Sequence, residues 1–185
     1  SSPNDKAGAL DEIRARCGDL LEGRRFYEAL DRKGNQWGPC FQSSREFWRG
    51  PNEALARVEV VESLAAEMRR YCFHPAVSDS CGHALVSILP LEATSGATGG
   101  AFVGGGVGEV RFHRSPRGSK LWAHAVVKRR EGPAQNVIIG DVFVYEPDGT
   151  LLSETLDARL WYLEPADTAG VLGAPRDWFY QVAWH

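Results

Sequence analysis

The stretch YCFHPAVSDSCGHALVSIL, residues 71–89, combines a helical pattern with a dense group of reactive side chains. Pro75 suits the first turn of a helix, and apolar residues then recur at helical spacing until Pro90. These apolar residues are Val77, Cys81, Ala84, Leu85 and Ile88. The stretch therefore predicts a mostly buried helix.

The segments around this helix alternate with period two and are separated by turn residues. Pro147-Asp148-Gly149 is a turn signal between two of them. Because no repeating strand–helix–strand unit is seen, we expect an antiparallel sheet and an α+β fold. The predicted strands are a hairpin of 41–50 and 53–61, then 107–114, 119–130, 136–146, 150–164 and a closing strand 178–184.

Two further segments complete this picture. Residues 9–34 predict two short helices, because apolar positions share a face and Gly18 and Gly34 stand where helices end. The Gly-rich segment 91–108 lacks a phosphate-binding motif, and we expect a loop that enters a strand.

Composition limits the function before any motif is considered. At 185 residues, with 43% hydrophobic content, the chain is expected to form one globular domain. Its net charge of −3 and scattered basic residues argue against nucleic acid and membrane surfaces as partners. No signal peptide or membrane span is evident, and the four cysteines lack regular spacing. We therefore expect free thiols and a cytoplasmic location.

Cys72, His74, Cys81 and His83 are residue types that bind zinc. Residues two apart on a helix do not face each other, so Cys81 and His83 cannot easily converge on one ion. A Cys–His nucleophilic pair meets the same obstacle, although Cys40 could approach from elsewhere. We expect no metal.

Asp79 and His83 are four residues apart and share one face of the predicted helix. A carboxyl among Val77, Ser78, Cys81 and Ala84 would be desolvated, which favours its neutral, proton-donating form. A general acid oriented by a histidine is one interpretation. A polar pair on a surface stripe is the other, and pattern alone makes it the commoner case.

Several motifs occur in a fixed order along nearly the whole chain. They are WGPCF (37–41), FWRG (47–50), EALARV (53–58), HPAVSDSCGH (74–83), FVGGGVGEVRFHR (102–114), LWAHAVV (121–127), ARLWYLE (158–164) and WFYQVAWH (178–185). Together they resemble the C-terminal hotdog half of a polyketide synthase dehydratase domain. In that family two hotdogs, each an antiparallel sheet wrapped around a long central helix, form one domain.

The resemblance implies a reaction and roles for residues. An acyl chain arrives on the phosphopantetheine arm of an acyl carrier protein, with no directly bound cofactor. A His of the N-terminal half removes the α proton, and Asp79, hydrogen-bonded by His83, protonates the departing β-hydroxyl. From the residues themselves we assign Cys72 and Cys81 to packing, and His74 mainly to structure, because it precedes Pro75 at the helix entry. The candidate substrate-binding residues are Trp37, Gly38, Pro39, Phe41, His74 and Phe102.

The chain departs from the family pattern in one important respect. No histidine starts the H-x-x-x-G-x-x-x-x-P motif that holds the base, so we expect half an active site that is nearly inactive alone. Trp37 also replaces the usual Tyr of Y-G-P-x-F. We divide the chain into a lead-in linker and helix (1–22), a hotdog core (23–164) and a C-terminal loop with the closing strand (165–185).

The expected partners are acyl carrier protein, the His-bearing half, other synthase domains and a second copy in a homodimer. Two alternatives stay open: an inactive scaffold or docking hotdog, and a double-bond isomerase or cyclase on the same fold. His113 and His124 fall in predicted strands where solvent-facing positions are the default, and His185 is terminal.

Overall fold

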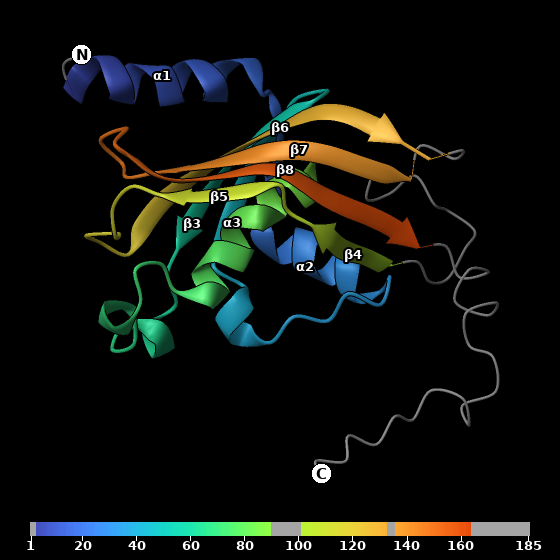
Figure 1. The fold of residues 1–185 in the computed structure, drawn as a ribbon, viewed down its shortest axis with the longest axis horizontal. Helices are drawn as coiled ribbons and strands as arrows, with labels where there is room; N and C mark the ends of the chain where they lie inside the picture. Colours follow the sequence, from blue (N-terminus) through green and yellow to red (C-terminus); the bar gives the residue numbers. More distant parts are fainter. Residues whose placement is uncertain (1–2, 90–100, 133–135, 164–185) are drawn as a thin grey trace, which may run out of the picture.

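The computed structural model describes residues 3–89, 101–132 and 136–163 (Figure 1). Its helices are α1 (Pro3–Arg16), α2 (Gly23–Asp31) and α3 (Pro75–Ser87), with short 3-10 turns at Pro39–Phe41, Glu62–Leu64 and Met68–Arg70. Its strands are β1 (Asp19–Glu22), β2 (Ser44–Arg49), β3 (Glu53–Glu59), β4 (Ala101–Gly106), β5 (Glu109–Phe112), β6 (Lys120–Glu131), β7 (Val137–Tyr145) and β8 (Leu151–Leu163). Within these ranges no helix is long and apolar enough to cross a membrane.

All the strands belong to one antiparallel sheet. Its order is β1-β2-β3-β6-β7-β8-β4, and β5 also pairs with β8. Figure 1 shows α2 and α3 on one side of this sheet and α1 on the other. Helix α3 packs against β2, β3, β6 and β7. The predicted α+β hotdog architecture, with a central helix against an antiparallel sheet, is confirmed.

Small residues let α3 lie close to the sheet. Ala54 pairs with Ala125 and Ala56 with Ala123, and all four side chains are fully buried. Nearby, a Cβ added to Gly140 would lie 2.5 Å from the carbonyl oxygen of Val126 and 2.7 Å from a methyl of Leu85. Helix and sheet therefore approach closely on this face, and the interior is closely packed.

The start of α3 is set by two residues. His74 is the N-cap, and its Nδ1 accepts a hydrogen bond from the Ala76 amide at 3.2 Å. Pro75 follows at the first helical position, where its missing N–H leaves no partner unsatisfied. The predicted helix is confirmed.

A second, smaller core lies between α1 and the outer face of the sheet. Its members are Leu10, Ile13, Cys17, Trp48 and Leu55. Trp48 on β2 and Leu55 on β3 alternate with strand residues that belong to the main core. His124 lies on this side, where its Nε2 is 3.0 Å from the Glu53 carboxylate. The expectation that His124 faces solvent is wrong, because α1 and its neighbours leave only 8% of the residue exposed.

The other sequence predictions can be placed on this fold. The two N-terminal helices, the 41–61 hairpin and the four strands between 107 and 164 are confirmed. Strand β1 was missed, because four residues at a sheet edge carry too little alternation to signal a strand. The expectation of a loop over 91–108 is wrong for residues 101–106, which form β4 by pairing with β8, because a glycine-rich segment lacks the alternation that signals a strand. The predicted strand 178–184 lies outside the described residues.

Candidate active site

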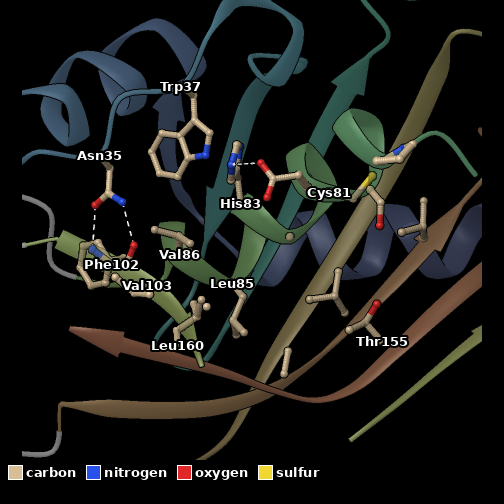
Figure 2. Close-up of a pocket in the computed structure, with 18 of the residues that line it drawn as sticks. Asn35, Trp37, Cys81, His83, Leu85, Val86, Phe102, Val103, Thr155 and Leu160 are labelled. Carbon is tan, nitrogen blue, oxygen red and sulfur yellow. Dashed lines mark hydrogen bonds and ion pairs between the residues drawn. The ribbon is translucent and has the colours of Figure 1, made fainter. Parts of the chain in front are cut away.

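A cavity of about 700 Å³ opens along one face of α3 (Figure 2). The helix contributes Pro75, Ser78, Asp79, Gly82, Leu85 and Val86, which follow helical spacing, together with Cys81 and His83. The remaining wall comes from residues 34–37, from β4 and from β7 and β8. It includes the apolar side chains of Val142, Val144, Ala158 and Leu160. The cavity therefore has one polar end beside a largely apolar wall.

The polar end is the Asp79–His83 pair. The Asp79 carboxylate oxygen lies 3.2 Å from Nε2 of His83, as the i,i+4 spacing predicts. The His83 side chain is 3% exposed, whereas that of Asp79 is 46% exposed. The expectation that Asp79 is desolvated is wrong for this chain, because Asp79 lies on the open side of α3 while its apolar neighbours turn toward the sheet.

Aromatic rings surround the His83 imidazole. The ring centroid of Trp37 lies 4.6 Å from it, and those of Tyr27 and Phe26 lie 5.5 and 5.8 Å away. The Tyr27 hydroxyl lies 3.1 Å from Nδ1 of His83. Burial raises the pKa of Tyr27 to about 12, against a smaller opposing effect of the Ser44 amide. The phenol therefore stays neutral at physiological pH and can form hydrogen bonds.

The other imidazole nitrogen is less well satisfied. Nε2 of His83 is buried and forms no aligned hydrogen bond, although it lies near the Asp79 carboxylate. An unpaired buried polar atom is costly, and His83 lines the cavity. Nε2 and the carboxyl can therefore share a polar group of a ligand, such as a hydroxyl.

Trp37 and Phe102, both predicted to contact substrate, line the cavity (Figure 2). Asn35 joins the segments that carry them. Its side-chain amide donates to the Phe102 carbonyl and accepts from the Phe102 amide, both at 2.7 Å. Sequence reasoning missed Asn35, since its only signal was its place beside the turn at Gly34.

The other predicted substrate-binding residues lie beside the cavity and do not line it. Gly38, Pro39 and Phe41 belong to the 3-10 turn before β2, and Ser80 on α3 donates a hydrogen bond to the Phe41 carbonyl at 2.8 Å. That contact ties the turn to the helix. His74 is occupied in capping α3. A role for these residues in substrate binding stays a prediction.

The cysteines differ from one another. Cys81 is buried in the core, and burial raises the pKa of its thiol to about 12, so it is a poor nucleophile. Cys72 is exposed, so the expectation that it packs in the interior is wrong. It precedes the cap of α3, outside the buried stretch. In the described part of the chain, no three His, Cys, Asp or Glu side chains form a metal-binding group.

The solved structures that superpose on this chain include dehydratase domains. The CurJ dehydratase of curacin polyketide synthase superposes with a TM-score of 0.75 at 20% identity, over 85% of this chain and 55% of that one. A CurK dehydratase with an Asp-to-Asn substitution, described as an inactive mutant, superposes with a TM-score of 0.70 at 20% identity over 83% and 52%. The chain therefore spans about half the length of these domains.

Sequence comparison also relates this chain to segments of polyketide synthases. Polyketide synthase GfsB of Streptomyces halstedii is 30% identical over 164 residues, which are 85% of this chain and 3% of that protein. GfsE of the same organism is 29% identical over 163 residues, 86% of this chain and 4% of that protein. The family model described as "Polyketide synthase dehydratase N-terminal domain" matches residues 5–168. The chain belongs to the polyketide synthase dehydratase family.

Proposed function

We propose that this chain is the acid-bearing half of a dehydratase that removes water from a β-hydroxyacyl chain attached to acyl carrier protein. The observation that carries the proposal is the Asp79–His83 pair at the polar end of a cavity with an apolar wall. A carboxyl and an imidazole nitrogen suit a leaving hydroxyl, and the apolar wall suits an alkyl chain.

The motif content supports the C-terminal half. The family model is described as an N-terminal domain, but the H-x-x-x-G-x-x-x-x-P motif that the family resemblance associates with the base is missing from the 185-residue sequence. The chain instead carries H-P-x-x-x-D-x-x-x-H at residues 74–83, on α3. The inactive Asp-to-Asn mutant of the CurK dehydratase is a precedent for an essential aspartate on this fold.

In the proposed reaction, a His of the other half removes the α proton of the thioester. The electron pair forms the α,β double bond as the bond from the β carbon to oxygen breaks. Asp79 donates its proton to the departing oxygen, and water leaves. Nε2 of His83 holds the hydroxyl and the carboxyl in place, while Tyr27 orients the ring from the opposite nitrogen.

The exposure of Asp79 supports the need for a partner half. A carboxyl that is 46% exposed is well solvated, whereas a general acid gains from a drier site that favours its neutral form. A second hotdog over the mouth of the cavity would remove that water. Exposed apolar side chains on one end of the sheet, which such a partner would cover, are Val103, Val107, Val110, Phe112 and Trp161.

The test is dehydration by a reconstituted two-half enzyme. The chain is combined with a His-bearing dehydratase half and offered β-hydroxyacyl groups on acyl carrier protein, and loss of water is followed by mass spectrometry. The wild-type pair should dehydrate the substrate, and Asp79→Asn should lower the rate by about 10²–10⁴-fold. Asn keeps the shape of the side chain but cannot donate the proton.

Asp11→Asn is the matched control, since Asp11 is exposed on α1, on the opposite side of the sheet from α3. Full activity of Asp79→Asn, or no activity of the wild-type pair, would favour a scaffold role. Product analysis separates the other reactions: a shifted double bond indicates an isomerase, and an oxygen ring indicates a cyclase.

A further inference from the structure

Gly82 leaves an open space on the wall of the cavity. It lies in the interior of α3, three residues after Asp79 and next to His83. A Cβ added to Gly82 would meet no heavy atom within 4 Å, and the residue lines the cavity. The residues on either side of it in the chain, Cys81 and His83, are both buried.

Neither backbone geometry nor packing accounts for this glycine. Its φ is not in the left-handed region, so any residue could adopt its conformation. Gly140 and Gly23 differ, since a Cβ at either would collide with a carbonyl oxygen. Because Gly is the least favourable residue after Pro inside a helix, Gly82 weakens α3 without any structural gain.

The open space lies close to the proposed chemistry. Residues three apart on a helix are neighbours, with Cβ positions about 5–6 Å apart. A ligand whose hydroxyl contacts Asp79 would therefore place the carbons next to its β carbon beside Gly82. Farther along the same stripe of α3, Leu85 and Val86 offer an apolar surface for the rest of the chain.

We propose that Gly82 is a specificity-determining residue that makes room for a methyl branch next to the hydroxyl-bearing carbon of the acyl chain. This inference rests on the proposed function for the orientation of the chain in the cavity. The branch can be attached to the α or the γ carbon, because both are equally far from the hydroxyl. A side chain at position 82 would occupy that room.

The experiment measures binding to the full chain, so it does not depend on catalysis. The probes are β-hydroxyhexanoyl pantetheine amide, its α-methyl derivative and its γ-methyl derivative, titrated by calorimetry. Burial of one methyl group should make a branched probe bind about fourfold more tightly than the unbranched one. Gly82→Ala should weaken the branched probe by about tenfold and the unbranched probe by less than about threefold.

Two further measurements complete the test. Gly18→Ala adds the same methyl in open space away from the cavity and should leave all three affinities unchanged. Gly82→Ala should raise Tm by about 2–4 °C, since Ala favours the helix and meets no neighbour. If Gly82→Ala weakens the binding of only the α-methyl probe or only the γ-methyl probe, the affected probe identifies the position of the branch.

Other results would overturn the inference. One is that Gly82→Ala weakens the binding of branched and unbranched probes equally, or weakens neither. The others are that Gly82→Ala lowers Tm, or that the wild-type chain binds none of the probes. If the branched probe binds selectively but the reconstituted pair does not dehydrate, the proposed function fails while the role of Gly82 stands.

Discussion

The Tyr27 hydroxyl lies 3.1 Å from Nδ1 of His83, so a residue of α2 contacts the imidazole on the side away from Asp79. The same hydroxyl accepts a hydrogen bond from the Ser44 amide and lies 3.3 Å from the Phe41 carbonyl. If the hydroxyl donates its hydrogen to the Phe41 carbonyl, it can only accept from His83, so Nδ1 must carry the ring proton and Nε2 is free to accept a hydrogen bond. Tyr27 therefore helps to set the tautomer of His83, and with it whether the Nε2 that faces Asp79 is a hydrogen-bond acceptor.

Tyr27→Phe removes this hydroxyl with little change in shape. We expect a loss of about 1–2 kcal/mol in the free energy of unfolding, because buried partners lose their hydrogen bonds. We also expect the ¹⁵N chemical shifts of the His83 ring to show a changed tautomer population. Urea unfolding and NMR measure the two effects. Tyr71→Phe is the control, since Tyr71 is exposed; unchanged ring shifts in Tyr27→Phe would contradict this role.

His83→Gln should be milder than loss of the carboxyl. An amide can still hydrogen-bond both Asp79 and a substrate hydroxyl, so we expect the reconstituted enzyme to keep its rate within about tenfold. His83→Leu fills the space without hydrogen bonding and should lose about 10²-fold or more. Steady-state dehydration rates measure both. Equal rates for the Gln and Leu variants would show that hydrogen bonding at this position does not matter.

Asn35→Ala should loosen the rim of the cavity. It removes both hydrogen bonds that join Asn35 to the backbone of Phe102. We expect faster hydrogen–deuterium exchange in β4 and a loss of about 1–3 kcal/mol in the free energy of unfolding. Gln36→Ala, at the exposed neighbouring position, is the control. Unchanged exchange in residues 101–106 would argue against this connection.

Glu53 should make the docking of α1 depend on pH. Arg16 donates a hydrogen bond to the Glu53 carboxylate and lowers the pKa of Glu53, burial opposes this, and His124 adds to the lowering. A carboxyl with a depressed pKa stabilises the fold above its unfolded pKa of about 4.3, and this stability is lost as pH falls through the folded value. Stability should therefore fall on acidification below about pH 5.

Glu53→Gln tests this pH dependence. It should cost about 1 kcal/mol at neutral pH, a modest value because solvent screens the half-exposed Arg16. The difference from wild type should shrink in acid, as measured by urea unfolding from pH 7 to pH 3 or so. Glu28→Gln, in an exposed pair on α2, is the control. A difference that stays constant with pH would contradict the assignment.

Gly140→Ala should destabilise the fold, in contrast to Gly82→Ala. An added Cβ would lie 2.5 Å from the Val126 carbonyl oxygen, so β6 or α3 must move. We expect a loss of about 1–3 kcal/mol or more, measured by urea unfolding. Gly18→Ala serves again as the control. Unchanged stability of Gly140→Ala would mean that α3 does not lie as close to the sheet as described.

Much of the fold could be predicted because its signals are local. The spacing of Val77, Cys81, Ala84 and Leu85 is enough to indicate a buried helix, and period-two alternation is enough to indicate the long strands. Short edge strands such as β1 cannot be predicted in this way, since their stability comes from pairing with a neighbouring strand. The Asp79–His83 contact could also be predicted, because a helix brings residues four apart together.

The sequence by itself determined the helix, the strands, the family resemblance and the pairing of Asp79 with His83. Only the tertiary structure decided that Tyr27 reaches His83, that Asn35 holds β4, that His124 is buried and that Asp79 is exposed. The physical reason is distance along the chain. Tyr27 and His83 are 56 residues apart. The periodicity of one segment predicts its own helix or strand, but it does not indicate which side chains meet when α2 and α3 pack on the sheet.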